Sequence, residues 1–203
     1  LMLQMREQAA RFGADIRTED VTAVRFSDDP LATPHEIDAP SGTIRARAVI
    51  VATGATARQI GLESETRLQG RGVSYCAVCD GAFFREQEIV VVGGGDSAME
   101  EATFLTKFAS KVTIVHRREE LRASKIMIER ARENAKIAWE LGYVVDEVLG
   151  DDAVTGIRIR ETEGTATKEI PCTGFFVAIG HDPTTALFQG VLDMDENGYL
   201  LQQ

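Results

Sequence analysis

Cysteine is scarce in this sequence, which also has no long apolar run and no block of basic residues. Its three cysteines are too few, and too odd in number, for a disulfide scaffold, so we expect a reducing compartment, namely the cytoplasm. No apolar stretch approaches the roughly 18 residues that cross a bilayer. The 22 basic and 32 acidic residues give a net charge of −10. We therefore expect neither a nucleic acid nor a membrane as partner, because both surfaces attract clustered positive charge.

The N-terminal residues do not have the composition of a targeting signal. They contain no basic segment and only a short apolar run, and the sequence opens on Leu1 rather than on Met. We interpret this start as a cut end. The total of 203 residues is enough for one large domain or two small ones.

Two sequence patterns occur twice along the chain. Residues 21–26 and 154–159 alternate apolar and polar side chains, which is typical of a half-solvated meander. Residues 49–54 and 175–180 are apolar runs that end in glycine, which is typical of a buried parallel strand. The repeat predicts an α/β fold of two related domains, each combining a parallel sheet and helices with a three-stranded β-meander, the first incomplete.

The predicted boundary between the two domains lies near Gly70 to Gly72, because the connection before it has no steady period. The resulting segments are residues 1–70, 71–198 and 199–203. In the first segment we expect a helix over residues 3–12 that ends at Gly13, then the meander and the apolar strand. A glycine turn equivalent to the one in the second segment would lie upstream of Leu1.

The second segment opens with the pattern of a dinucleotide-binding turn. A β-branched strand over residues 89–92 leads into Gly93, Gly95 and Ala98, which fit G-x-G-x-x-A, and a helical period follows over residues 96–107. The first glycine permits the tight turn, the second lets a pyrophosphate approach the backbone, and the alanine allows close helix packing. An ordinary glycine-rich turn is the alternative, but the position between strand and helix favours nucleotide binding.

Basic residues stand where the acceptor for a ribose hydroxyl is usual. The strand over residues 112–115 is followed by His116, Arg117 and Arg118, with Arg122 shortly after, whereas an NAD site places Asp or Glu there. Guanidinium groups pair with a 2′-phosphate through forked, charged hydrogen bonds. The pattern favours NADP(H) over NAD(H). A solvated basic loop beside acidic neighbours is the alternative.

Two cysteines lie close together at the entrance to the second domain. Cys76 and Cys79 have the C-x-x-C spacing, which lets two thiols close a small disulfide ring and exchange electrons in pairs. Zinc is disfavoured because no second ligand pair accompanies them, so we expect no metal. Cys172 is interpreted as a packing residue. Asp80 is either a surface turn residue or, as we favour, a proton donor to a departing thiolate.

Nicotinamide gives up two electrons as hydride, whereas thiols exchange electrons through sulfur, and a flavin usually connects the two. The sequence therefore implies a flavin as a third redox centre. With this combination, the chain resembles the bacterial low-molecular-weight thioredoxin reductases. The resemblance covers the whole chain. It is carried by the segments around residues 49–55, 72–81, 93–101, 116–122 and 177–181.

The resemblance implies an FAD-containing homodimer that passes electrons from NADPH through FAD to the cysteines and then to thioredoxin. Residues 1–70 would be part of the FAD domain, residues 71–198 the NADPH domain, and residues 199–203 the return to the FAD domain. Cys79 would face the flavin, Cys76 would attack the thioredoxin disulfide, and Asp80 would protonate the thiolate. The NADPH site would comprise Gly93, Gly94, Gly95, Asp96, Ser97, Glu100, His116, Arg117, Arg118 and Arg122.

The resemblance also implies that the NADPH domain rotates, with hinges near Gly70 to Gly72 and after Gly198. Two FAD-binding segments of the family are absent from these residues, so we expect this chain alone to hold no FAD and to be inactive. The alternatives are the flavoprotein subunit of an alkyl hydroperoxide reductase system and a non-catalytic NADP-binding module. Flavin reductases that serve ferredoxin are disfavoured because they lack the cysteine pair.

Overall fold

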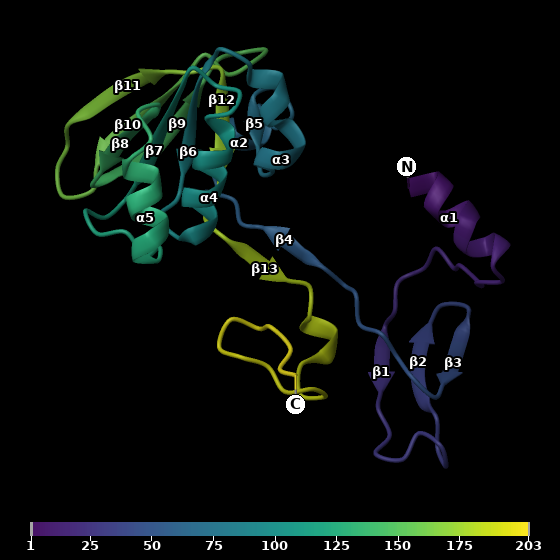
Figure 1. The fold of residues 1–203 in the computed structure, drawn as a ribbon. Helices are drawn as coiled ribbons and strands as arrows, with labels where there is room; N and C mark the ends of the chain where they lie inside the picture. Colours follow the sequence, from purple (N-terminus) through teal and green to yellow (C-terminus); the bar gives the residue numbers. More distant parts are fainter. Residues whose placement is uncertain (1, 203) are drawn as a thin grey trace. The chain divides into compact units, whose positions relative to one another are not determined.

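The computed structural model describes residues 2–202, which divide into two compact units. One unit is Thr56–Asp182, and the other combines the residues up to Ala55 with those from Pro183 onward. Two segments join the units, and within them β4 (Ala55–Ala57) and β13 (His181–Pro183) pair in a two-stranded sheet (Figure 1).

A five-stranded parallel sheet is the centre of the larger unit. Its strand order is β5-β12-β6-β7-β8, so the chain crosses over between neighbouring strands. The strands are β5 (Val73–Ser74), β12 (Gly174–Val177), β6 (Glu88–Val92), β7 (Lys111–His116) and β8 (Ile137–Leu141). This order places the carboxyl ends of β7, β6 and β12 next to one another, where nucleotide sites form in such sheets.

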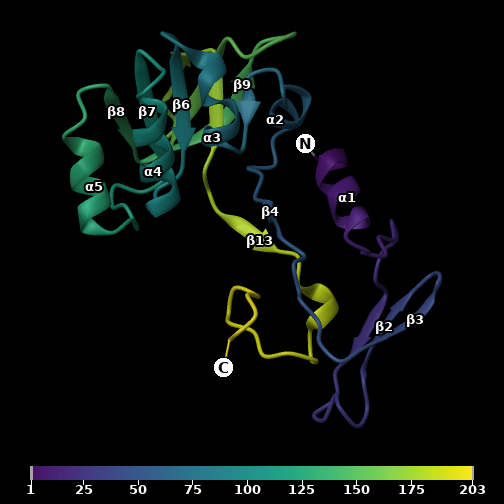
Figure 2. The same ribbon diagram turned by 45° about the vertical axis from the view of Figure 1, so that its right-hand side comes forward.

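Two layers cover the faces of this sheet. The helices α4 (Asp96–Leu105) and α5 (Lys125–Arg132) pack on one face (Figure 2). An antiparallel meander of β9 (Tyr143–Leu149), β10 (Gly156–Glu161) and β11 (Thr167–Pro171) packs on the other. The predicted α/β class, with a parallel sheet and antiparallel strands, is confirmed.

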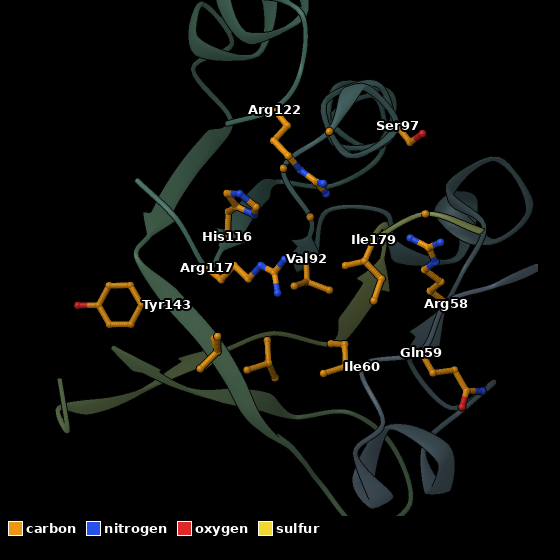
Figure 3. A pocket seen from close by; sticks show the side chains of 16 residues that line it. Arg58, Gln59, Ile60, Val92, Ser97, His116, Arg117, Arg122, Tyr143 and Ile179 are labelled. Carbon is orange, nitrogen blue, oxygen red and sulfur yellow. The ribbon is translucent and has the colours of Figure 1, made fainter. Parts of the chain in front are cut away.

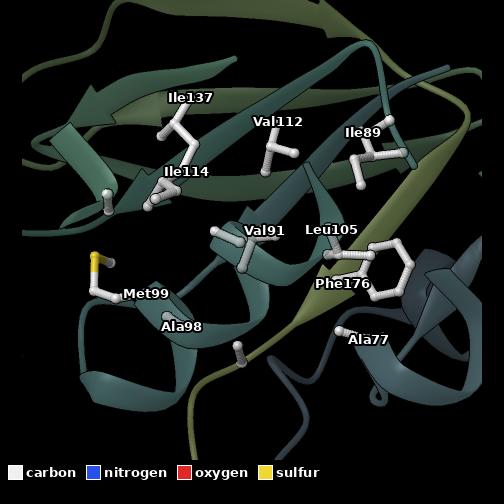
Figure 4. Packing of buried hydrophobic residues seen from close by; sticks show 14 of the residues in the cluster. Ala77, Ile89, Val91, Ala98, Met99, Leu105, Val112, Ile114, Ile137 and Phe176 are labelled. Atoms are coloured by element: carbon white, nitrogen blue, oxygen red, sulfur yellow. The ribbon is translucent and has the colours of Figure 1, made fainter. Parts of the chain in front are cut away.

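The apolar runs of the sequence are explained by burial on both faces of the parallel sheet. Val91 and Phe176 face the helices, whereas their chain neighbours Val90 and Phe175 face the meander, and all four are fully buried. Figure 4 shows Val91 and Phe176 in the cluster on the helix side, packed with Leu105. A strand that is buried on both sides needs apolar side chains at every position, which removes the usual alternation.

The larger unit also contains three short helical segments, α2 (Glu63–Arg67), α3 (Ala77–Asp80) and the 3-10 turn η1 (Gly81–Phe84). Residues 70–72, where we expected a boundary, lie inside this unit. The carbonyl of Arg71 accepts from Val154 N at 2.9 Å, and that of Gly72 accepts from Phe175 N at 2.8 Å. A Cβ at Gly72 would lie 2.7 Å from Val154. The close packing fixes this segment, so the division between the units falls at β4 and β13 instead.

The smaller unit holds the first meander. Its elements are α1 (Met2–Arg11), β1 (Ala23–Arg25), β2 (His35–Ala39), β3 (Gly42–Ala46) and the 3-10 turn η2 (Ala186–Phe188), and the three strands form an antiparallel sheet in the order β1-β2-β3. Gly13 has a φ of +89°, as expected for the residue that ends α1. Phe26 stacks on Phe188, with ring centroids 6.5 Å apart.

The strand predicted over residues 49–54 was wrong. The structure assigns no strand to residues 47–54, and Ile50 is 92% exposed. A buried parallel strand requires hydrogen-bonding neighbours on both sides, and no strand among residues 2–202 pairs with this segment. The corresponding run in the larger unit has such neighbours and becomes β12.

Within residues 2–202, no helix is long and apolar enough to cross a membrane. The same residues contain no cluster of histidine, cysteine and acidic side chains that could hold a metal ion.

Candidate functional site

The glycine turn connects β6 to α4, as the sequence predicts, and its first glycine is required by packing. Gly93 has a φ of +151°, and a Cβ there would lie 2.2 Å from the carbonyl oxygen of Ala178. The Gly93 N–H donates to Val115 O at 3.0 Å. Only glycine fits this position, because any side chain would collide with the backbone that follows β12.

The middle glycine makes room for a histidine. A Cβ at Gly94 would lie 2.4 to 2.5 Å from three atoms of the His116 ring, so the ring packs directly on the Gly94 backbone. The Gly94 carbonyl accepts from the backbone N–H groups of Arg122 at 2.8 Å and Ala123 at 3.0 Å. The segment that carries the arginines is therefore tied to the glycine turn by its backbone.

The third glycine faces open space. A Cβ at Gly95 would meet nothing within 4 Å, and its φ of −99° is open to all residues. Gly95 borders a pocket of about 570 Å³, which α4 approaches with its N-terminus. Backbone N–H groups at the start of a helix attract anions, and an open glycine lets a phosphate approach them. The turn thus offers a cradle that fits a pyrophosphate.

Most of the residues expected to bind NADPH line this pocket. They are Gly93, Gly94, Gly95, Ser97, His116, Arg117 and Arg122. Figure 3 shows Arg117 and Arg122 on the same side of the pocket as His116, with Ser97 at the start of α4. The residues that the structure gives as lining this pocket include three arginines and no carboxylate, which suits a ligand of negative charge.

Three residues of the expected set do not line the pocket. Asp96 accepts from the N–H and the hydroxyl of Ser124, at 2.7 and 2.9 Å, and so links α4 to the start of α5. Glu100 is exposed on α4. Arg118 borders a separate hollow together with Glu119 and Glu120.

His116 is buried, with 6% of its surface exposed, and its Nε2 has no hydrogen-bond partner among residues 2–202. Burial lowers the pKa of this histidine, and the nearby charges of Arg122, Arg117 and Arg118 lower it further. Both effects favour the neutral form of the ring. A buried polar atom without a partner is costly, and a ligand in the pocket would supply one.

The sequence interpretation missed several residues of the pocket wall. Arg58, Gln59 and Ile60 follow β4, and Ile179 and Gly180 follow β12. The residues at the start of β9, beginning with Tyr143, also line it. The rule that ligands bind at the carboxyl ends of neighbouring parallel strands could have found Gly180, given the strand order.

The two cysteines of the C-x-x-C sequence form a disulfide in the same unit. Their Cα atoms are 5.3 Å apart, and Cys76 is the N-cap of α3, where its sulfur accepts from Cys79 N at 3.2 Å. Cys79 is exposed and Cys76 is half-buried. Cys172 is buried outside this pair, and burial raises the pKa of its thiol to about 12, consistent with a packing residue.

A hydroxyl connects the disulfide to Asp80. The Ser74 hydroxyl donates to Asp80 Oδ2 at 2.6 Å and accepts from the backbone N–H of Cys76 at 3.1 Å. Ser74 is buried, whereas Asp80 is half-buried. The carboxyl group is thus held at the end of the turn that contains both sulfurs, where a proton donor to a thiolate would be needed.

A second carboxyl group, on α4, lies next to α3, the helix that contains Cys79. Glu101 on α4 accepts from the Ala77 backbone, and its Oε2 is buried without a hydrogen-bond partner among residues 2–202. Burial raises the pKa of Glu101 to about 7, with a further contribution from the charge of Glu100. Glu101 belongs to the segment 93–101 that carries the family resemblance, but no sequence pattern predicts its burial, because that burial depends on the packing of α3 against α4.

Residues 4–202 match the family described as pyridine nucleotide-disulphide oxidoreductase. The chain is similar to a thioredoxin reductase of Mycolicibacterium smegmatis, with 54% identity over the whole chain and 64% of that protein. It is also similar to a bifunctional thioredoxin reductase/thioredoxin of Mycobacterium leprae, with 52% identity over 99% of the chain and 43% of that protein.

Among solved structures, a thioredoxin reductase from Giardia duodenalis has a TM-score of 0.86 and 39% identity, over all of this chain and 65% of that one. The chain therefore spans less than two thirds of the length of these proteins.

Proposed function

Because the chain belongs to the pyridine nucleotide-disulphide oxidoreductase family, we propose that it works as a thioredoxin reductase. In this proposal NADPH reduces the Cys76–Cys79 disulfide, and the resulting thiols reduce the disulfide of thioredoxin. The observation that carries the proposal is one unit that contains both a disulfide and a nucleotide pocket. The similarity to thioredoxin reductases over the whole chain supports it.

The choice of NADPH over NADH rests on charge. Arg117 and Arg122 line the pocket beyond the end of β7, where the ribose of the adenosine half is expected. A 2′-phosphate would accept forked hydrogen bonds from these guanidinium groups, and no lining carboxylate would repel it. The family resemblance also implies Asp96, Glu100 and Arg118 for this site, and these three residues lie off the pocket wall.

The overall reaction balances with one additional proton. NADPH, a proton and the disulfide give NADP⁺ and two thiols, so nicotinamide is oxidised and the S–S bond is reduced. A bound FAD would supply the conversion between hydride transfer and sulfur chemistry. The residues described in the smaller unit form no glycine turn between a parallel strand and a helix, so we assign no FAD contact to individual residues.

The residues at the disulfide have separate proposed roles. Cys76 attacks the thioredoxin disulfide, and Cys79 would be the sulfur that faces a bound flavin, which would supply the electrons. Asp80 donates a proton to the thiolate released during exchange, and the Ser74 hydroxyl holds its carboxyl group at 2.6 Å. These roles come from the family resemblance together with the local hydrogen bonds.

The proposed partner is thioredoxin, and the proposed assembly is a homodimer in the cytoplasm. Val78 lies between the two cysteines and Phe83 in the 3-10 turn that follows them, and with 74% and 76% exposure they offer apolar surface to a protein substrate. The similarity to a relative that is named as both thioredoxin reductase and thioredoxin supports this partner. The alkyl hydroperoxide reductase flavoprotein remains the second candidate within the same chemistry.

Thiol titration tests the proposal. The full-length protein, loaded with FAD, is denatured and titrated before and after anaerobic NADPH. We expect NADPH to add two thiols to the count, from Cys76 and Cys79, whereas Cys172 contributes one thiol in both states. Cys79→Ser removes the disulfide and serves as the control. A count that NADPH does not change would favour the non-catalytic NADP-binding module and contradict the proposal.

A further inference from the structure

Arg58 is a pocket residue that belongs neither to the glycine turn nor to the basic segment after β7. It follows β4, far from both in the sequence, yet it lines the same pocket. Its backbone N–H donates to Gly180 O at 3.0 Å, and its Nε donates to Asp182 Oδ1 at 2.7 Å. The chain just beyond β12 therefore holds Arg58 by both its backbone and its side chain.

Within residues 2–202 the side-chain hydrogen bond of Arg58 is made by Nε, so the terminal nitrogens of this guanidinium remain available for a ligand. A Cβ at Gly180 would lie 3.7 Å from Arg58 Nη1, so this nitrogen lies directly over a glycine that has no side chain to cover it. Figure 3 shows Arg58 close to Ile179, across the pocket from Arg117. The Nε contact with Asp182 fixes the plane of the guanidinium and leaves its other edge for forked hydrogen bonds.

The strand order assigns the parts of a dinucleotide to positions along the pocket. The glycine turn after β6 takes the pyrophosphate, and the basic residues after β7 take the adenosine half. On the other side of β6 the neighbouring strand is β12, which is followed by Ile179 and Gly180. The half that remains, nicotinamide mononucleotide, would therefore lie over the end of β12, where Arg58 is held.

We propose that Arg58 binds the nicotinamide mononucleotide half of NADPH, through its phosphate and ribose hydroxyls, and that Asp182 is the positioning residue that orients the guanidinium. This inference rests on the proposed NADPH site and adds a second charged anchor to it. The two anchors lie at opposite ends of the pocket and bind different halves of one ligand. A ligand that lacks the nicotinamide half would not contact Arg58.

Isothermal titration of the full-length protein with NADP⁺ and with 2′,5′-ADP separates the two anchors. The second ligand keeps the adenosine half with its 2′- and 5′-phosphates and lacks nicotinamide mononucleotide. We expect Arg58→Ala to lower the affinity for NADP⁺ about tenfold or more, because a charged hydrogen bond is lost. Its affinity for 2′,5′-ADP should stay within about twofold of wild type, which also shows that the pocket is folded.

Matched variants sharpen the test. Arg117→Ala should lower the affinity for both ligands, because Arg117 is one of the basic residues after β7 that are proposed to bind the adenosine half. Asp182→Asn should lower the affinity for NADP⁺ less than Arg58→Ala does, since the guanidinium keeps its charge but loses an ionic partner. Arg58→Lys should restore part of the NADP⁺ affinity, because a lysine keeps the charge and loses the fork.

Two results would overturn the role of Arg58. One is an Arg58→Ala variant that loses equal affinity for NADP⁺ and for 2′,5′-ADP. The other is an Arg58→Ala variant with unchanged affinity for NADP⁺. Failure of the proposed NADPH site is distinguishable, because the wild-type protein would then not bind 2′,5′-ADP or would prefer NAD⁺ to NADP⁺.

Discussion

Adjacent glycines in the nucleotide turn have opposite requirements at the residue scale. Gly94 is covered by the His116 ring, whereas Gly95 faces the open pocket. We expect Gly94→Ala to displace the ring and to lower the free energy of unfolding by about 1 to 3 kcal/mol, as overpacking does. We expect Gly95→Ala to leave stability nearly unchanged. Its methyl group should obstruct the approach of the phosphate and so lower the affinity for NADP⁺.

Thermal melts and NADP⁺ titration of both variants measure the two effects separately. Equal loss of stability in Gly94→Ala and Gly95→Ala would contradict the assignment of the ring contact to Gly94. Unchanged NADP⁺ affinity in Gly95→Ala would show that the phosphate does not approach this backbone.

Glu101 makes stability depend on pH near neutrality. Its pKa in the folded protein is about 7, above the ordinary value of 4.5, because burial disfavours the charged carboxylate. Between these two values the folded state binds more protons than the unfolded state, so stability falls as pH rises. We expect Glu101→Gln to lose less stability than wild type between pH 5 and pH 8.

Urea denaturation at pH 5 and pH 8 measures this difference. The exposed neighbour Glu100 provides the control, and Glu100→Gln should keep most of the wild-type pH dependence. If both variants followed the wild-type curve, another group would be responsible for the pH dependence.

At the scale of elements, the sequence predicts what local signals specify. The strand β6, the glycine turn and α4 were found because a β-branched run, glycines and a helical period follow one another directly. The strand over residues 49–54 failed because a buried strand depends on neighbours that the sequence run does not specify. Arg58 was missed for a similar reason, since its place in the pocket follows from the order of β12 and β6.

Asp96 illustrates how a motif position can connect elements rather than contact a ligand. Its carboxylate accepts two hydrogen bonds from Ser124 at the N-cap of α5. We expect Asp96→Ala to cost about 1 kcal/mol of stability, as losing a capping interaction does, while NADP⁺ affinity changes little. Asp96→Asn keeps an acceptor and is the control.

Chemical denaturation and nucleotide titration of these two variants check the prediction. A loss of NADP⁺ affinity in Asp96→Ala that exceeded the loss of stability would instead place Asp96 in direct contact with the nucleotide.

At the scale of the whole molecule, the two compact units differ greatly in their cores. Nearly all of the buried apolar residues lie in Thr56–Asp182, where they form two clusters on either face of the parallel sheet. In the other unit, the buried apolar residues that the structure describes are Val24 and Phe188. Because apolar burial is the main favourable contribution to folding, the units should not unfold together.

We therefore expect residues 1–203 to lose structure in two steps on heating. Amide hydrogens of β1, β2 and β3 should exchange first, and those of β6, β7 and β12 last. The proposed NADP⁺ site lies in the larger unit, so NADP⁺ should slow exchange in the second group and raise only the later transition, by an amount set by its concentration over Kd. Hydrogen exchange measured by mass spectrometry with and without NADP⁺ resolves the two groups. A single transition in which NADP⁺ protects β1, β2 and β3 as strongly as β6 would mean that the units unfold as one, because only a cooperative link could carry the binding free energy to strands outside the pocket.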